Sequence, residues 1–345
     1  MKILFFSAAL LVFTIPASFA EEPEGWGKLA DMPEAKSEIV AVTIGDKIYV
    51  VGGLNNMARA TNTVYIYDTK ENSWTLAAQM PVSLHHVGAA GHGEMLYVVG
   101  GYFDGWQASN SLLIYDSKDD SWMMGKDMPT ARGALTAQFI DGKLYAVGGH
   151  DRIDYSVNEV YDPASDSWET KASMLTSREH LASAVLDDKL YVVGGRAAGI
   201  GNLNSNEMYD YTTDTWMTLE PLPTPRSGLT ASVLSGAIFV FGGESSHKTF
   251  NENEAYLPDE GWFSQIRMPT SRHGLGSATV EDKIYVIGGG VAPGFSFSGL
   301  NEVYHNTVIP EFGKLALIII SVSFLSAIII VRLKNQKKIF FKETD

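Results

Sequence analysis

Residues that could bind a ligand or move a proton fall on two kinds of recurring position in this sequence. The first kind is a pair of residues shortly after a Met-Pro dipeptide or its variant: Ser37-Glu38, His85-His86, Gly133-Ala134, Glu179-His180, Ser227-Gly228 and His273-Gly274. The second kind directly follows a Gly-Gly doublet: Leu54, Tyr102, His150, Arg196, Glu244 and Gly290. Five of the eight histidines stand at these positions. Since the residue type varies here while the flanking residues recur, we predict a binding surface.

Three kinds of chemistry are open to these residues. In a recognition site, loop aromatics such as Tyr102 and Trp106 would anchor a partner. In an enzyme, Glu179, His180 and Arg196 could serve as base, acid and anion clamp. In a metal site, imidazoles of different repeats could converge, namely those of His85, His86, His180 and His273. The spacing requires no metal, so we predict neither a metal nor a cofactor. A fourth interpretation treats the histidines as ordinary solvated loop residues.

The predicted ligand-binding residues are Glu38, His85, His86, Tyr102, Trp106, His150, Glu179, His180, Arg196, Glu244 and His273. Composition excludes several other functions. Without cysteine there is no disulfide, no thiolate metal ligand and no cysteine nucleophile. A net charge of −14 repels phosphates, which argues against nucleic-acid binding. The sequence has no Gly-x-Ser-x-Gly elbow and no glycine-rich loop opening a helix, as a nucleotide site would need.

A repeat sets the positions of these residues. Gly-Gly doublets begin at intervals of 48, 48, 46, 48 and 46 residues, at Gly52, Gly100, Gly148, Gly194, Gly242 and Gly288. Tryptophans follow the same steps: Trp26, Trp74, Trp122, Trp168, Trp216 and Trp262. In the third unit, residues 133–140, 143–147, 158–161 and 167–170 read as strands, with a hairpin turn at Asp141-Gly142. Four short antiparallel strands repeated six times predict an all-β, six-bladed propeller.

The repeat resembles the Kelch family over roughly residues 26–305. The resemblance rests on the doublets, on the spaced tryptophans and on Tyr-Asp dipeptides in the first four repeats, which begin at Tyr67, Tyr115, Tyr161 and Tyr209. Peptide-binding members imply that the variable positions line the mouth of the central channel. Secreted six-bladed members include sialic acid mutarotases, so a carbohydrate-active enzyme is the alternative function. Kelch copper oxidases are disfavoured because their cofactor needs a cysteine.

The order of the tryptophans and the Gly-Gly doublets along the chain predicts how the ring of blades closes. Trp26 precedes the first doublet and no tryptophan follows the sixth. We therefore predict that the segment around Trp26 supplies the fourth strand of the last blade, which removes a free sheet edge. In antiparallel blades the crossing loops and the loops after the doublets share one face, and their greater length marks it as the working face.

A recurring arginine precedes the variable pair in four repeats. These arginines are Arg132, Arg178, Arg226 and Arg272, and Lys36 and Leu84 take their place in the first two repeats. A charged residue that recurs at one structural position is expected to brace the loop rather than to contact a ligand.

Both ends of the sequence carry predicted targeting segments. Lys2, an apolar run and Ser18-Phe19-Ala20 predict a signal peptide over residues 1–20, with an uncleaved anchor as the alternative. The propeller is predicted over residues 21–307, a linker over 308–313, a transmembrane helix over 314–332 and a basic cytoplasmic tail over 333–345. The positive-inside rule then places the propeller outside the cell.

The linker contains Pro310-Glu311-Phe312-Gly313, followed by the apolar segment and the basic tail. This arrangement resembles the PEFG-type C-terminal sorting signal of archaeal surface proteins, although the tail beyond Lys338 is longer than that pattern. The resemblance implies processing by an archaeosortase near the motif. Taken together, we expect a cell-surface Kelch propeller, anchored in the membrane, that recognises a protein, peptide or glycan through one face.

Overall fold

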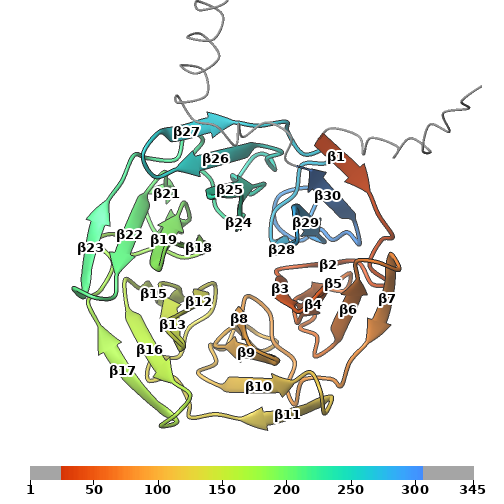
Figure 1. Cartoon of the computed structure of the whole chain (residues 1–345), viewed down its shortest axis with the longest axis horizontal. Helices are drawn as coiled ribbons and strands as arrows, with labels where there is room; N and C mark the ends of the chain where they lie inside the picture. The colour runs from red at the N-terminus through yellow and green to blue at the C-terminus, as the bar shows by residue number, and fades with distance from the viewer. Residues whose placement is uncertain (1–24, 306–345) are drawn as a thin grey trace, which may run out of the picture. The chain divides into compact units, whose positions relative to one another are not determined.

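The computed structural model describes residues 25–305. They form six four-stranded antiparallel sheets arranged as blades around an axis, which confirms the predicted all-β propeller (Figure 1). No helix within residues 25–305 has the length and hydropathy of a membrane span. The predicted signal peptide, linker, membrane helix and tail lie outside the described residues.

Each blade runs from an inner strand at the axis to an outer strand at the rim (Figure 1). Blade 1 contains β3 (Val40–Ile44), β4 (Lys47–Val51), β6 (Val64–Asp68) and β7 (Ser73–Leu76). Blade 2 contains β8 (Gly88–His92), β9 (Met95–Val99), β10 (Leu112–Asp116) and β11 (Ser121–Met124). Blade 3 contains β12 (Thr136–Ile140), β13 (Lys143–Val147), β16 (Asn158–Asp162) and β17 (Ser167–Lys171).

The other three blades repeat this order. Blade 4 contains β18 (Ala182–Leu186), β19 (Lys189–Val193), β22 (Asn206–Asp210) and β23 (Thr215–Thr218). Blade 5 contains β24 (Thr230–Leu234), β25 (Ala237–Phe241), β26 (Asn253–Leu257) and β27 (Gly261–Ser264). Blade 6 contains β28 (Gly276–Val280), β29 (Lys283–Ile287), β30 (Asn301–His305) and β1 (Gly25–Lys28).

Short strand pairs stiffen three of the loops at one end of the blades. They are β2 (Lys36–Ser37) with β5 (Leu54–Asn55), β14 (His150–Asp151) with β15 (Ile153–Asp154), and β20 (Arg196–Ala197) with β21 (Gly201–Asn202).

The hydrophobic core lies between neighbouring blades. The second strand of a blade is buried on both faces, and it therefore carries apolar residues at successive positions, as the sequence KIYVV of β4 shows. Tyr49 and Val51 of β4 pack in one cluster with Leu96 and Val98 of β9. Each blade thus buries part of its apolar surface against the next one.

The N-terminal strand closes the propeller as predicted. In the last blade the strand order is β1-β30-β29-β28, with Trp26 opposite Tyr304. The indole N–H of Trp26 donates to the carbonyl of Ile266, in the chain leaving the preceding blade, over 2.8 Å. The other tryptophans of the repeat make the same bond, over 2.7 to 2.9 Å.

The recurring arginines brace the blades, as predicted. Arg132 is fully buried, and its guanidinium donates to the carbonyl of Gly148 and to the carboxylate of Glu159. Equivalent buried pairs are Arg178–Glu207, Arg226–Glu254 and Arg272–Glu302. In blades 1 and 2, where Lys36 and Leu84 replace the arginine, the positions of the glutamate hold Tyr65 and Leu113. The arginine and the glutamate therefore occur together in blades 3 to 6, and both are replaced in blades 1 and 2.

Candidate functional site

One residue from each crossing loop contributes to a ring around the axis. These residues are Glu38, His86, Ala134, His180, Gly228 and Gly274, and we call them the axial ring. All six adopt left-handed backbone conformations, with φ between 51° and 61°. The backbone N–H of each donates to the carbonyl of the ring residue in the preceding blade, over 2.7 to 3.2 Å. Six hydrogen bonds thus close a circle through all six blades.

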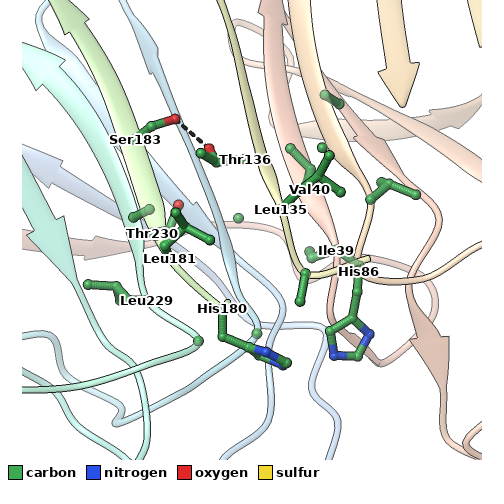
Figure 2. Close-up of a pocket in the computed structure, with 18 of the residues that line it drawn as sticks. Ile39, Val40, His86, Leu135, Thr136, His180, Leu181, Ser183, Leu229 and Thr230 are labelled. Carbon is green, nitrogen blue, oxygen red and sulfur yellow. Dashed lines mark hydrogen bonds between the residues drawn. The ribbon is translucent and has the colours of Figure 1, made fainter. Parts of the chain in front are cut away.

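The left-handed conformation explains where the inner strands begin. A strand was predicted from Gly133, but β12 begins at Thr136, because Ala134 has a φ of 52° that an extended strand does not allow. The turn directs the ring side chains toward the axis. His86 and His180 therefore face each other across the channel, with ring centroids 4.8 Å apart (Figure 2).

A cavity of about 130 Å³ lies on the axis next to this ring. Its walls are the inner strands of all six blades and the residues directly before them, which contribute mainly small and apolar side chains such as those of Val40, Leu135 and Leu181 (Figure 2). The titratable side chains in its lining belong to the axial ring, namely Glu38, His86 and His180. Charged chemistry is therefore concentrated at the mouth of the channel.

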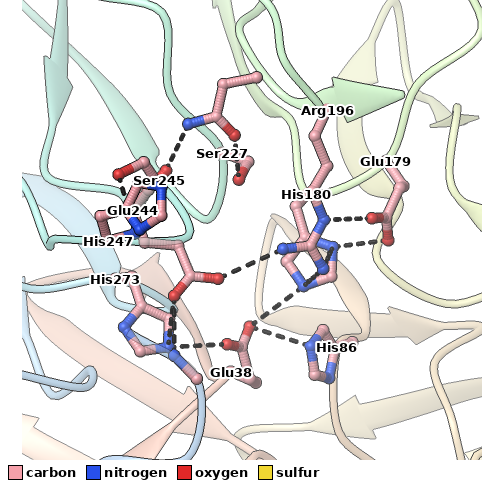
Figure 3. Close-up of polar contacts among 12 residues, drawn as sticks. Glu38, His86, Glu179, His180, Arg196, Ser227, Glu244, Ser245, His247 and His273 are labelled. Atoms are coloured by element: carbon pink, nitrogen blue, oxygen red, sulfur yellow. Dashed lines mark hydrogen bonds and ion pairs between the residues drawn. The ribbon is translucent and has the colours of Figure 1, made fainter. Parts of the chain in front are cut away.

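Glu38 is the centre of a polar cluster at this mouth (Figure 3). Its carboxylate oxygens lie 3.2 Å from Nε2 of His86, 3.5 Å from Nε2 of His273 and 4.0 Å from Nε2 of His180. All four side chains are largely buried. The residues come from four different blades, so only the closed propeller brings them together.

Arg196 joins the cluster from the loop after the fourth doublet (Figure 3). Its Nε donates to Glu179 over 2.5 Å, and a terminal nitrogen lies 3.3 Å from Glu244. Nδ1 of His180 lies 2.6 Å from the other oxygen of Glu179. Glu244 lies 3.6 Å from His273, which completes a circuit of contacts through Glu38 and back to His180.

We call Glu38, His86, Glu179, His180, Arg196, Glu244 and His273 the polar cluster. All seven residues belong to the ligand-binding set predicted from the sequence. The three catalytic candidates, Glu179, His180 and Arg196, are in direct mutual contact.

Burial and neighbouring charges shift the pKa values at this site. Burial alone disfavours the ionised form of Glu179, but His180 and Arg196 together outweigh it and lower the pKa of that carboxyl to about 2. Burial is also the main reason why the pKa of His86 falls well below its ordinary value. Burial lowers the pKa of His85 to about 4. Near neutral pH, Glu179 is therefore ionised, whereas His85 and His86 are uncharged.

An aromatic group flanks the polar cluster in blade 2. The ring of Trp106 lies 4.8 Å from that of His85 and 5.4 Å from that of Tyr102. Tyr102 is buried against Gly133, and its hydroxyl donates to the carbonyl of His150 over 2.7 Å. Trp106 is 50% exposed. Tyr102 thus supports the site from behind, while Trp106 is available to a ligand.

Hydrogen bonds join the loops after the doublets into a collar. The bonds run from Ala60 N–H to Asp104, from the Tyr102 hydroxyl to His150, from Ala198 N–H to Asp154, from the Asn202 amide to Glu244, from Gly294 N–H to Glu244 and from Lys36 N–H to Ser298. Each bond links one blade to the next. The collar holds the loops on the face that carries the crossing loops, which we call the loop face.

The sequence analysis missed the apolar tips of these loops. Five of the six loops carry exposed large apolar side chains: Met57, Trp106, Ile153, Ile200, Val291 and Phe295, of which only Trp106 was predicted. The signal was present in the sequence, because each stands between the predicted blade strands, where no core position needs an apolar side chain. Asp154 and Asn202, which fix the collar, were also missed.

Three of the cluster residues could hold a metal ion. One ligand atom each of Glu38, His86 and His180 lies within 4.8 Å of the other two. The four-histidine site considered from the sequence is not assembled, because Nδ1 of His85 contacts Nδ1 of His86 instead of facing Glu38.

Known proteins share the repeat and the fold described above. A model of the KLHDC2/KLHL20/DRC7 Kelch-repeats domain matches residues 38–174 and 160–308. A solved structure titled "Structure of YjhT" is similar with a TM-score of 0.72 and 17% sequence identity, over 81% of this chain and 98% of that one. At this identity the likeness shows the fold alone. No curated protein matches the sequence.

Proposed function

The chain belongs to the Kelch-repeat family that this domain model describes, and on this premise we propose that it is an extracellular, membrane-anchored recognition module. In this proposal the loop face of the propeller binds a surface protein, a peptide or a glycan. The polar cluster at the channel mouth supplies the charged contacts, and the loop tips surround it.

The observation that carries this proposal is the set of apolar loop tips. Met57 is 72% exposed, Ile200 74% and Phe295 66%. Apolar side chains at the tips of five loops on one face are typical of an interaction surface. Other exposed apolar side chains, such as Leu76, Met124 and Phe263, lie on the outer strands, where they serve as a comparison. The collar fixes the loops before a partner arrives, so binding would lose little loop entropy.

Two exposed side chains allow a matched test of this surface. Ile153 at a loop tip and Leu76 on the outer strand β7 are both 61% exposed. The purified protein is applied to printed peptide and glycan arrays, and binding is compared between wild type, Ile153→Ser and Leu76→Ser. We expect Ile153→Ser to lower array binding at least tenfold and Leu76→Ser to leave it unchanged. No array signal, or equal loss in both variants, would contradict the proposal.

The proposal includes the anchoring predicted from the sequence. Residues 1–20 would be removed on export, and residues 314–332 would hold the protein in the membrane until an archaeosortase acts near Pro310. The sequence pattern supports this part, with the order of motif, apolar segment and basic tail. Mass spectrometry of the mature C-terminus tests it, since an intact Asp345 on surface material rejects processing.

A carbohydrate-active enzyme resembling a sialic acid mutarotase is the second candidate function. The contact of Glu179 with both His180 and Arg196 favours it, because a carboxylate that orients an imidazole is common in proton-transfer sites. Proton-exchange NMR on sialic acids separates the two candidates. Mutarotation by the wild type that is lost in His180→Gln would establish the enzyme and overturn the recognition module as the primary function.

A further inference from the structure

A largely buried carboxylate surrounded by imidazoles stands at the centre of the polar cluster. Among residues 25–305, the Glu38 carboxylate lies 3.2 to 4.0 Å from Nε2 of His86, His180 and His273. The cluster holds three carboxylates, those of Glu38, Glu179 and Glu244, and the guanidinium of Arg196, which contacts the last two. A histidine binds a metal through its neutral imidazole, so the three carboxylates and the guanidinium around a bound ion would sum to two net negative charges. A divalent cation would balance that charge.

The spacing of the ligand atoms fits such a cation. Metal–ligand bonds of about 2.0–2.1 Å in a tetrahedral zinc site place the ligand atoms roughly 3.3 Å from one another. The Glu38 oxygen lies 3.2 Å from Nε2 of His86 and 4.0 Å from Nε2 of His180. Small side-chain rotations would therefore suffice to bind an ion.

The backbone holds these three residues in place. All three belong to the axial ring, whose hydrogen bonds and left-handed conformations leave the chain few alternatives. The blades they come from are the first, second and fourth, so an ion here would connect separate parts of the propeller. His86 and His180 are buried. The site is thus formed before any ion enters.

A supporting carboxylate orients one of the imidazoles. Glu179 lies 2.6 Å from Nδ1 of His180 and is itself held by Arg196. A carboxylate that accepts the Nδ1–H of a histidine leaves the Nε2 lone pair free to bind a metal, and metal-binding histidines commonly have such a partner. In His180 that Nε2 lies 4.0 Å from Glu38 and 3.4 Å from a terminal nitrogen of Arg196. The guanidinium would therefore have to turn toward Glu244 when an ion binds.

His273 adds a third imidazole next to Glu38. Its side chain is 1% exposed, and within the described part of the chain Nδ1 has no hydrogen-bond partner. Nε2 lies 3.5 Å from Glu38 and 3.6 Å from Glu244 (Figure 3). A buried polar atom without a partner is costly. An ion bound at Nε2 would leave Nδ1 as it is, so the two Nε2 distances are what place His273 beside the site.

We propose that Glu38, His86 and His180 bind a divalent transition-metal ion of the zinc class at the channel mouth, with His273 as the adjacent fourth donor. Imidazole nitrogens combined with one carboxylate suit zinc better than calcium or magnesium, which prefer oxygen ligands. The proposal departs from the expectation of no metal drawn from the sequence. It does not depend on the proposed recognition function.

Titration of the metal-free protein with ZnCl2 tests the site. The full-length protein is stripped with a chelator, and binding is followed by calorimetry. We expect one equivalent of Zn²⁺ to bind, and we expect Glu179→Gln, which removes only a supporting carboxylate, to weaken it about 10- to 100-fold. Glu38→Gln, His86→Gln and His180→Gln should weaken it more. The control His247→Gln, in an exposed loop of the same face, should bind as the wild type does.

Two results would overturn the proposal. One is binding of less than a tenth of an equivalent of each of Zn²⁺, Co²⁺, Ni²⁺ and Cu²⁺. The other is undiminished binding by Glu38→Gln, His86→Gln and His180→Gln.

Because a variant can fail to fold, the wild type is also loaded with Co²⁺. A cobalt spectrum distinct from that of the aqueous ion, and abolished by Zn²⁺, supports the site, whereas the spectrum of the aqueous ion overturns it. Ile153→Ser should bind Zn²⁺ normally, so failure of the recognition proposal can be told from failure of this one.

Discussion

Single residues of the axial ring combine an unfavourable backbone conformation with a functional side chain. The left-handed region favours glycine, yet Glu38, His86, Ala134 and His180 occupy it. Each such residue costs about 1–2 kcal/mol. Three of the four contribute their side chains to the polar cluster, and strained residues of this kind persist where surrounding bonds fix them. The six backbone bonds of the ring supply that constraint.

The glycine at the sixth ring position gives the first prediction. Gly274 has a φ of 56°, and a Cβ there would lie 2.5 Å from the carboxylate of Glu38 and 2.8 Å from its backbone nitrogen. Gly45 has a φ of 62° but open space around it. Gly45→Ala should cost about 1 kcal/mol from backbone strain, and Gly274→Ala about 1–3 kcal/mol more from the collision. Urea unfolding measures both, and equal losses would show that the ring tolerates a side chain.

The second prediction concerns the buried braces. Arg178 and Glu207 lie 2.6 Å apart with almost no exposure, whereas Lys70 and Asp46 lie 2.6 Å apart in solvent. Arg178→Met leaves a buried carboxylate without a partner and should lower the free energy of unfolding by about 3–5 kcal/mol. Lys70→Met should change it little, because water screens exposed pairs. Similar losses in the two variants, measured by urea unfolding, would show that burial is not what makes the brace matter.

At the scale of elements, blade 1 differs from blades 3 to 6 in how its crossing loop is fixed. Lys36 replaces the arginine, and its ammonium group donates to Gly52 and to Thr61 instead of to a glutamate on the third strand. Burial, partly opposed by Glu34, lowers the pKa of Lys36 from 10.5 to about 8. The blade thus keeps a cation at the position without the buried anion that stabilises it elsewhere.

A pH dependence follows as the third prediction. The folded protein releases the Lys36 proton near pH 8, while the unfolded chain holds it to about pH 10.5. The free energy of unfolding should therefore rise with pH across this window, by at most about 1.4 kcal/mol per pH unit. Below pH 8 the folded protein bears the full cost of burying the charged Lys36. Lys36→Met should remove this rise. Urea unfolding at several pH values compares the two proteins, and identical slopes would contradict the assignment.

The whole molecule shows which features a repeat makes predictable. A residue's position within the repeat predicts its place in a blade, because each repeat puts the same residue at the same point. This position was enough to predict the strand order, the role of the arginines and closure through Trp26. Side-chain contacts between blades across the central axis cannot be predicted from the position of a residue within its repeat. Glu38 meets His273 from the other end of the chain, and that meeting depends on a left-handed turn that the sequence pattern around Ala134 did not reveal.

The same limit applies to residues within one loop. His85 and His86 are adjacent in the sequence, but only His86 belongs to the axial ring, and His85 packs on Trp106. Tyr102 occupies a predicted binding position and is buried. The repeat therefore identifies the face on which a side chain lies, whereas packing decides whether that side chain is free to bind.

Closure gives the last prediction, which concerns the stability of the ring as a whole. An open array of repeats can lose its terminal units separately, whereas a closed propeller has none to lose. Deleting residues 22–29 removes β1, leaves β30 as an unpaired edge and removes the bond from Trp26 to Ile266. The melting temperature should fall sharply, and amides of β28, β29 and β30 should exchange with deuterium before those of blade 3. Trp168→Ala loses the equivalent indole bond but keeps every strand pair, so it should lower the melting temperature by less than the deletion does. An unchanged melting temperature after the deletion would mean that the inter-blade cores, and not the closing strand, hold the circle together.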